Sequence, residues 1–245
     1  MHQNSIRMSQ KKKLLKFAEC RTFPHFFEPE LHYSMNKDYE LKSKWKEEFF
    51  KNNNPITLEI GCGKGEYSVE LARQNPENNY IGIDIKGARM WRGAKDSLNM
   101  GLKNIAFVRT RVEFTPLCFA KNEIDEIWIT FPDPQLGPKK RIRKRLTSSQ
   151  FLTKYQSFLK DNGTVHLKTD DDTLYNYTKE VVALNKLEVL KDIGDLYNSD
   201  FYTGIMRVKT HYEKLWTEKD RTIKYLKFLL PADLQIIEPV VKDDK

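Results

Sequence analysis

The chain has 245 residues and a formal net charge of +8 at pH 7, a length sufficient to bury the core of one α/β domain with extensions. Its apolar runs are short and its basic N-terminus precedes no long apolar segment, so we expect no transmembrane helix and no secretory signal. Its three cysteines are widely spaced, which predicts a cytoplasmic protein without a metal cluster. The isoelectric point near 9.2 indicates attraction to polyanions.

Residues 1–54 mix lysines with aromatic side chains and carry no strong strand pattern. We interpret them as a basic, aromatic extension that is partly helical near residues 41–50. Two fates are open for the aromatic side chains: they stack on nucleic-acid bases, or they pack the extension onto the domain. Lys11, Lys12 and Lys13 are candidates for contacts with phosphate.

A buried strand is predicted over residues 56–60, and it runs directly into the closely spaced glycines Gly61, Gly63 and Gly65. Glycines in such a loop permit positive φ and let the backbone lie against a ligand. A helix is expected over residues 65–74. The pattern is typical of a nucleotide-binding loop, and a strand-turn-helix without a ligand is the simpler alternative.

Two features of this loop favour S-adenosylmethionine over a dinucleotide. The glycines follow G-x-G-x-G, whereas the dinucleotide fingerprint is G-x-G-x-x-G. Glu59, two residues before the first glycine, would repel a pyrophosphate and can hold a cationic ligand. Asp84 lies in the next strand, residues 79–85, about twenty residues beyond the loop, where a ribose-binding acid belongs. A nicotinamide-dependent oxidoreductase is therefore disfavoured.

A helix over residues 88–99 and strands over 105–108 and 126–131 follow, and the last strand leads into Phe131-Pro132-Asp133-Pro134. Ligands of open parallel sheets bind beyond the carboxyl ends of the strands, and the prolines would hold Asp133 rigidly. The basic segment Pro138–Arg145 carries six cations. Alone, these features are compatible with a chance turn and a solvated loop; together they predict one cleft with a cofactor loop, a fixed acid and a phosphate-binding patch.

Further along the chain, Thr147 and Gln150 suggest a capping box for a helix that ends at Asp161-Asn162-Gly163. A strand over 164–168 follows, in which His166 is interpreted as a core residue, and Asp171 or Asp172 is expected to cap the next helix, residues 172–185. Strands are predicted near 187–192 and over 222–230. We divide the chain into an extension (1–54), a domain (55–231) and a tail (232–245).

Over residues 10–231 the chain resembles the bacterial tRNA (guanine-N7)-methyltransferases, most closely those of the Bacteroidetes type. The glycine loop with Glu59, and Asp84, mark methyltransferases in general. The motifs specific to this family are Phe131-Pro132-Asp133-Pro134 with Lys139-Lys140, Lys144-Arg145-Leu146-Thr147, His166-Leu167-Lys168-Thr169-Asp170 and Thr210-His211-Tyr212-Glu213.

The resemblance implies a Rossmann-like fold with a seven-stranded, mostly parallel sheet and an antiparallel last strand. It implies methyl transfer from S-adenosylmethionine to N7 of the variable-loop guanosine at position 46 of tRNA. The protein would be a monomer or homodimer with no membrane, no metal and no obligate protein partner. The implied site comprises Asp133 as catalytic residue, Glu59, Gly61, Gly63, Gly65, Asp84 and Asp133 at the cofactor, and Lys139, Asp170, Thr210, His211, Tyr212 and Glu213 at the substrate.

Two positions depart from the family pattern. Arg111 stands where the family more often has Asp or Asn near the adenine, which leaves Glu113 or the backbone to make that contact. The segment from Asp133 to Lys139 is also longer than the usual Asp-Pro-Trp-Pro-Lys. A methyltransferase of the same fold with another substrate and a non-catalytic RNA-binding protein remain the alternative functions, because a fold does not define a substrate.

Overall fold

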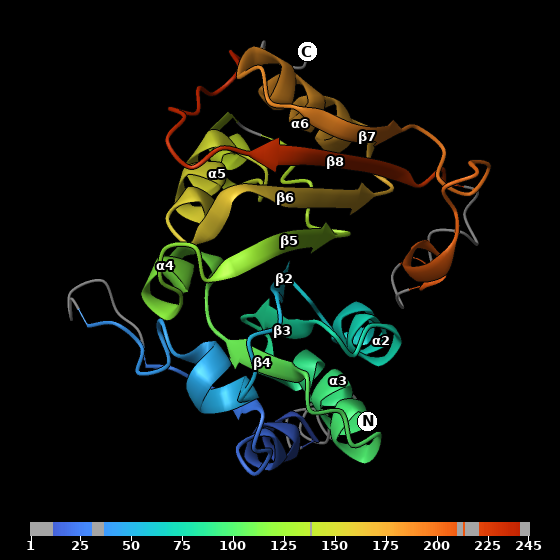
Figure 1. The fold of residues 1–245 in the computed structure, drawn as a ribbon. Coiled ribbons are helices and arrows are strands. Elements are labelled where there is room, and N and C mark those ends of the chain that lie inside the picture. The colour runs from blue at the N-terminus through green and yellow to red at the C-terminus, as the bar shows by residue number, and fades with distance from the viewer. Residues whose placement is uncertain (1–11, 31–36, 138, 210–212, 214–220, 241–245) are drawn as a thin grey trace, which may run out of the picture.

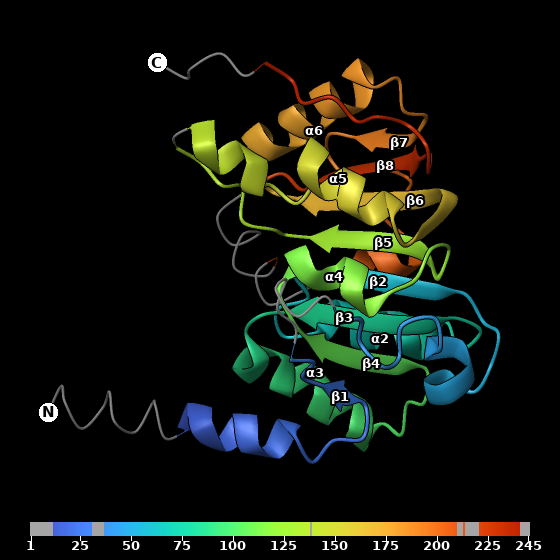
Figure 2. The ribbon, with the colours of Figure 1, turned by 90° about the vertical axis from the view of Figure 1, so that its left-hand side faces the viewer.

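The computed structural model describes residues 12–30, 37–137, 139–209, 213 and 221–240. Their strands form one eight-stranded sheet in the order β1-β4-β3-β2-β5-β6-β8-β7, which Figure 2 shows stacked from β7 at the top to β1. The strands are β1 (Phe26–Phe27), β2 (Ile56–Ile60), β3 (Asn79–Asp84), β4 (Ile105–Arg109), β5 (Ile124–Thr130), β6 (Leu159–Thr169), β7 (Val189–Ile193) and β8 (Lys224–Leu230).

Strand directions confirm the predicted Rossmann-like architecture. The neighbours from β1 to β6 pair in parallel, and the last strand, β8, pairs antiparallel with both β6 and β7. The expected number of seven strands is exceeded by one, because Phe26 and Phe27 of the extension pair with Phe107 and Val108 at the edge of the sheet. Two residues inside a basic, aromatic segment leave no alternation by which to predict a strand.

The order of the strands creates a switch point between β2 and β5. From β2 the chain moves outward to β3 and β4, then returns to the other side of β2 to form β5 and β6. In sheets of this kind a crevice opens beyond the carboxyl ends of the two strands at the switch. The loop after β2 and the turn after β5 therefore face the same space.

Helices cover both faces of the sheet (Figure 1). The helices α2 (Glu66–Gln74) and α3 (Gly87–Asn99) pack on one face, and α4 (Thr115–Cys118), α5 (Ser149–Gln156) and α6 (Asp172–Leu184) on the other. Strand β4 shows the division, since Ile105 and Phe107 lie in the first core layer and Ala106 and Val108 in the second. Because both faces of such a strand are buried, its sequence is a continuous run of apolar residues. Short helical turns complete the fold: η2 (Trp45–Phe50), η3 (Val112–Phe114), η4 (Lys139–Lys144) and η5 (Gly204–Arg207).

The described part of the extension is built into the core. A helix over residues 12–20 precedes β1, and Phe23 and Phe26 are buried in the layer of α2 and α3. Trp45 and Phe50 are buried in the opposite layer. These four aromatic side chains therefore pack the extension onto the domain and do not form an exposed surface for stacking on bases.

Two local predictions are wrong. Asp161-Asn162-Gly163 does not end a helix but lies inside β6, where the register against β5 shifts and Asn162 adopts a φ of 54°. The residue at the start of α5 is Ser148, and the Thr147 hydroxyl pairs instead with the Thr178 hydroxyl at 2.7 Å. A partner on α6, 31 residues away in the sequence, thus replaces the local capping contact.

Candidate active site

The glycine loop after β2 has the backbone that its sequence predicts. Gly61, Gly63 and Gly65 have φ values of 75°, 58° and 72°, in the left-handed region that side chains with a Cβ rarely adopt. The amides of Gly61 and Cys62 both donate to the carbonyl oxygen of Ile83, at 2.8 and 2.9 Å. These bonds fold the loop over the end of β3, and helix α2 starts directly after it.

Glu59 lies beneath this loop rather than on its surface, with 2% of the residue exposed. Its Oε2 accepts a hydrogen bond from the Ser68 amide at 2.9 Å and one from the Ser68 hydroxyl, while Oε1 accepts from Thr130 Oγ1 at 2.6 Å. Burial raises the pKa of the Glu59 carboxyl to about 7, and these hydrogen bonds oppose the rise. The side chain thus joins the start of α2 to the end of β5 behind the loop.

Asp84 occupies the end of β3, beside the loop. Its Oδ2 accepts from the Gly63 amide at 3.0 Å and its Oδ1 from the Lys86 amide at 2.7 Å. A carboxylate offers about four lone-pair positions, so each oxygen retains capacity for a hydroxyl of a ligand. The next side chain, Ile85, is 52% exposed.

A pocket of about 350 Å³ opens beyond the ends of β3 and β4. Ile85 and Phe114 supply apolar wall, and Arg111 lines the pocket while pairing with Glu113 at 3.2 Å. Arg109 and Thr110 also line the pocket, together with four residues of the extension that the sequence did not predict: Arg21, Glu28, Pro29 and Glu30. Glu28 is fixed there by ion pairs to Arg109 and Arg21 at 2.8 and 2.9 Å.

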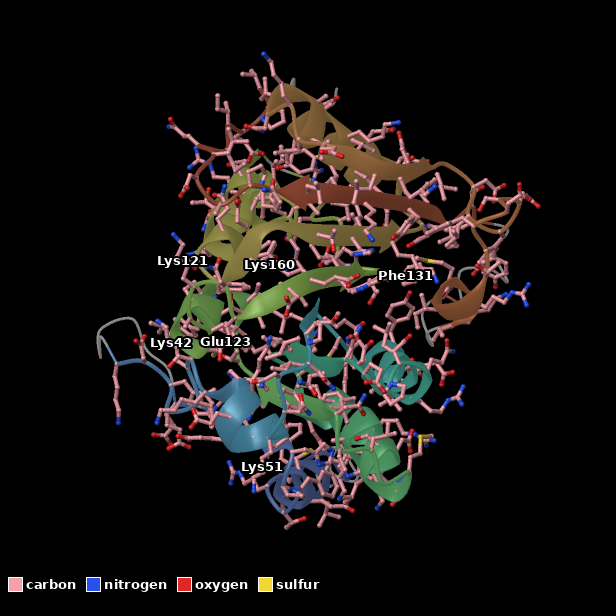
Figure 3. All side chains as sticks on the ribbon, viewed as in Figure 1. Lys42, Lys51, Lys121, Glu123, Phe131 and Lys160 are labelled. Carbon is pink, nitrogen blue, oxygen red and sulfur yellow. The ribbon has the colours of Figure 1, made fainter. Side chains whose placement is uncertain are left out.

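Asp133 lies exposed in the turn that follows β5. Phe131, at the right-hand end of β5 in Figure 3, begins this turn with a φ of 47°, and Gln135 has a φ of 52°. The Gln135 amide donates to Asp133 Oδ1 at 2.9 Å. Because β2 and β5 are adjacent, the turn and the glycine loop leave neighbouring strands at the same edge of the sheet, as the sequence predicts.

The predicted substrate residues fall into three groups. Asp170 follows β6, next to the end of β5, and its Oδ2 pairs with Arg221 at 2.6 Å. Glu213 is fully buried; its Oε1 accepts from Lys168 Nζ at 2.8 Å and from the Tyr197 hydroxyl at 2.6 Å. Lys139 begins η4; Thr210, His211 and Tyr212 lie outside the described residues.

Several polar residues of the region are structural. His166 is 2% exposed and hydrogen-bonds the Tyr225 hydroxyl at 2.7 Å, which confirms its assignment to the core, and burial lowers the pKa of its ring. Asp171 caps α6 by accepting from the Leu174 amide at 2.7 Å. Among the residues that the structure describes, no group of three or more His, Cys, Asp and Glu side chains could hold a metal ion. None of the helices in this part of the chain has the length and the apolar character needed to span a membrane.

Comparisons with known proteins identify the relatives of this chain. Residues 53–226 match a protein family described as "Putative methyltransferase". The tRNA (guanine-N(7)-)-methyltransferase of Bacteroides fragilis is 48% identical over 232 residues, covering 95% of this chain and 91% of that protein. The protein of the same name from Christiangramia forsetii is 46% identical over 222 residues, 90% of this chain and 99% of its own length.

Solved structures support the fold alone, because their sequences are distant. The 16S rRNA methyltransferase KamB superposes with a TM-score of 0.57 at 16% identity, over 76% of this chain and 92% of that one. An antibiotic-related methyltransferase gives 0.56 at 17% identity, over 79% and 96%. Because 48% and 46% of the aligned residues are identical over 95% and 90% of its length, the chain belongs to the tRNA (guanine-N7)-methyltransferase family.

Proposed function

We propose that this chain transfers the methyl group of S-adenosylmethionine to N7 of the variable-loop guanosine at position 46 of tRNA. The observation that carries the proposal is the 48% identity to a tRNA (guanine-N(7)-)-methyltransferase over 95% of the chain. An identity of this extent over nearly the full chain supports a shared activity as well as a shared fold. The exposed acid after β5, beside the glycine loop, supports the same assignment.

The groups around the glycine loop fit S-adenosylmethionine. The carboxylate of Asp84, held by the Gly63 amide, suits the hydroxyls of a ribose, and Ile85 and Phe114 offer apolar surface to a purine in the adjoining pocket. Arg111 lines that pocket, so we assign the adenine side to it and to its partner Glu113. Glu59 would act from beneath, by fixing the loop through Ser68 and by adding negative charge near a cationic ligand.

Guanine N7 has a lone pair and no proton, so the chemistry needs no general base. S-adenosylmethionine supplies, when bound, an electrophilic methyl group on a positively charged sulfur. Asp133 would orient the reacting groups, and its negative charge would stabilise the purine that becomes cationic. Orientation of this kind contributes up to about 7–11 kcal/mol in favourable intramolecular reactions. Asp133 is therefore our catalytic residue.

Substrate binding is assigned to the surface around this turn. We propose that Asp170 and Lys139 contact tRNA together with Thr210, His211 and Tyr212, while Glu213 contributes from its buried pair with Lys168. The exposed cations of the basic segment would bind phosphates irrespective of sequence. We further propose that the protein works in the cytoplasm, as a monomer or homodimer, without a metal or an obligate protein partner.

The test incubates the purified chain with methyl-labelled S-adenosylmethionine and unmodified tRNA transcripts, and locates the label by strand cleavage specific for 7-methylguanosine. We expect cleavage at one variable-loop guanosine. Label at another site would keep the enzyme class and overturn the position, and tRNA binding without label would indicate a non-catalytic RNA-binding protein. In the same assay Asp133→Asn should fold and bind tRNA but lose about 100-fold or more in kcat; near-normal turnover would remove Asp133 from the reaction.

A further inference from the structure

Arg145 differs from the other cations of the basic segment. Arg141, Arg143 and Lys144 are exposed, as expected for residues that bind phosphate. Arg145 ends the same segment but is only 4% exposed. Its guanidinium is therefore directed into the protein, where an arginine is rare unless it is paired.

The partners of Arg145 connect two parts of the structure. Its Nε donates a hydrogen bond to the carbonyl oxygen of Pro134 at 3.0 Å. The guanidinium carbon lies 4.4 Å from the centre of the ring of Tyr177, a buried residue of α6, in the arrangement of a cation–π contact. The Tyr177 hydroxyl in turn donates to Glu238 of the C-terminal tail. Arg145 thus joins the turn that contains Asp133 to helix α6.

The turn that Arg145 holds is strained. Phe131 and Gln135, on either side of Asp133, both have positive φ without being glycine, and such residues cost about 1–3 kcal/mol each. Strained positions persist only where the surroundings enforce them. The Phe131 amide is fixed by the Lys168 carbonyl oxygen at 2.8 Å, and the other side of the turn is fixed by Arg145 at Pro134.

From this geometry we infer that Arg145 is a positioning residue, which locks the turn so that the Asp133 carboxylate keeps one orientation. The inference rests on the role proposed for Asp133. Since Asp133 Oδ1 accepts from the Gln135 amide, the carboxylate keeps its direction only while the turn stays closed. Leu146, the next residue, lies beside the glycine loop, with its Cδ1 3.7 Å from where a Cβ on Gly61 would be. Arg145 therefore contacts the turn after β5, while Leu146 lies beside the glycine loop.

The first experiment compares Arg145→Met with Lys144→Met, its exposed neighbour, in steady-state methylation of tRNA. Arg145→Met should lower kcat about 100-fold, the effect of a displacement of about 1 Å, and leave KM for tRNA and the salt dependence of tRNA binding unchanged. Lys144→Met should instead act on binding: KM for tRNA rises, and the slope of log K against log salt falls by about 1. Arg145→Lys keeps a donor but not the planar stack, and should restore part of kcat.

A second readout does not depend on activity. Amide hydrogen exchange at Gln135 should be at least 10-fold faster in Arg145→Met than in the wild type, because the turn opens when its clamp is removed. Tyr177→Phe keeps the ring and loses the hydroxyl, so it should leave the exchange rate at Gln135 and kcat unchanged. Tyr177→Leu removes the ring, so it should raise the exchange rate at Gln135 and lower kcat. All variants are compared well below their unfolding temperatures. If Arg145→Met does not fold, the same measurements of kcat and exchange are made on Arg145→Lys.

Two results would overturn the inference. If a folded Arg145→Met had the kcat and the Gln135 exchange rate of the wild type, the turn would keep its conformation without Arg145. A loss of salt dependence equal to that of Lys144→Met would make Arg145 a phosphate contact. If the wild type methylates no tRNA, the proposed function fails by itself, while the exchange at Gln135 still decides whether Arg145 clamps the turn.

Discussion

The carboxyl of Glu59 shows how one residue beneath the glycine loop couples folding to pH. Its pKa is raised to about 7 by burial, whereas a glutamate in an unfolded chain titrates near about 4.3. Between these values the folded protein keeps a proton that the unfolded chain has lost. The contribution of Glu59 to stability is therefore complete below about pH 4.3 and is lost as the pH rises toward 7.

We predict that Glu59→Gln removes this pH dependence. A glutamine can still accept from Ser68 and can donate to Thr130, so the fold should be kept. Relative to the variant, the wild type should lose on the order of 3 kcal/mol between pH 4.3 and 8, measured by urea unfolding across this range. Glu47→Gln, at an exposed position, is the control. Equal pH profiles for the two variants would show that Glu59 is already ionised in the folded protein.

At the same scale, the sequence identified residues by type but not by environment. It placed Glu59, Asp84 and Asp133 near one another, because strand ends in a parallel sheet meet at one edge. It counted Arg145 among the six cations of the basic segment, and the resemblance placed Glu213 at the substrate. Arg145 is buried against Tyr177, and Glu213 is buried with Lys168 and Tyr197. These partners come from other segments of the chain, so the residues next to Arg145 or Glu213 in the sequence do not predict them.

At the scale of elements, the helices α2 and α3 meet through glycines. Gly65 begins α2 with a φ of 72°, and a Cβ there would lie 2.5 Å from the Phe107 ring. A Cβ on Gly93, inside α3, would lie 2.6 Å from the Lys64 carbonyl oxygen and 3.0 Å from the Cα of Gly65. These neighbours of Gly93 are backbone atoms of the glycine loop. Helix α3 therefore supports the loop by direct contact.

We predict that Gly93→Ala destabilises the protein. Alanine inside a helix gains roughly 1 kcal/mol over glycine, but overpacking costs about 1–3 kcal/mol. Because the 2.6 Å contact is with a backbone oxygen, we expect a cost near the upper end of that range and a net loss of about 2 kcal/mol. Urea midpoints measure this loss, and calorimetry should show weaker binding of S-adenosylmethionine as the loop shifts. Gly194→Ala, where no atom lies within 4 Å of the new Cβ, should be neutral. Equal midpoints for the two variants would disprove the close contact.

Most elements of the domain were predictable because their signals are local. The predicted strand 56–60 and helix 65–74 agree within one residue with β2 and α2, since a short apolar run and a glycine loop specify them without distant partners. The Thr147 capping box failed because Ser149 and Thr147 find partners elsewhere: the Ser149 amide donates to Glu238 at 2.9 Å, and Thr147 pairs with Thr178. Tertiary contacts replaced the local signal.

At the scale of the whole molecule, Trp45 and Phe50 of the extension pack into the same hydrophobic core as the domain. Trp45 is fully buried, its indole N–H donates to the Cys118 carbonyl oxygen at 3.0 Å, and its ring lies 5.8 Å from that of Phe119. Glu123 accepts from the Ser43 and Trp45 amides at 2.9 and 3.2 Å. The boundary predicted at residues 54 and 55 is thus crossed by packed side chains and hydrogen bonds.

We predict that Trp45→Ala lowers the free energy of unfolding by about 3–5 kcal/mol and that the protein still unfolds in one transition. Trp91→Ala is the control, because Trp91 is half-buried and its ring contacts Lys16 and Lys95 at the surface; its loss should be smaller. Denaturant unfolding followed by circular dichroism measures both variants. An unchanged main transition in Trp45→Ala would mean that the extension folds apart from the domain.

The sequence by itself determined the alternation of strands and helices, the glycine loop, the acids at the strand ends and the family. Each of these depends on residues close in the chain, whose spacing sets backbone geometry directly. Only the tertiary structure decided that the extension adds a strand and a pocket wall, that Glu59 lies beneath the loop, and that Arg145 faces Pro134 and Tyr177. Burial and pairing are properties of distant segments brought together, and a charged side chain changes from a surface group to a structural one only through those neighbours.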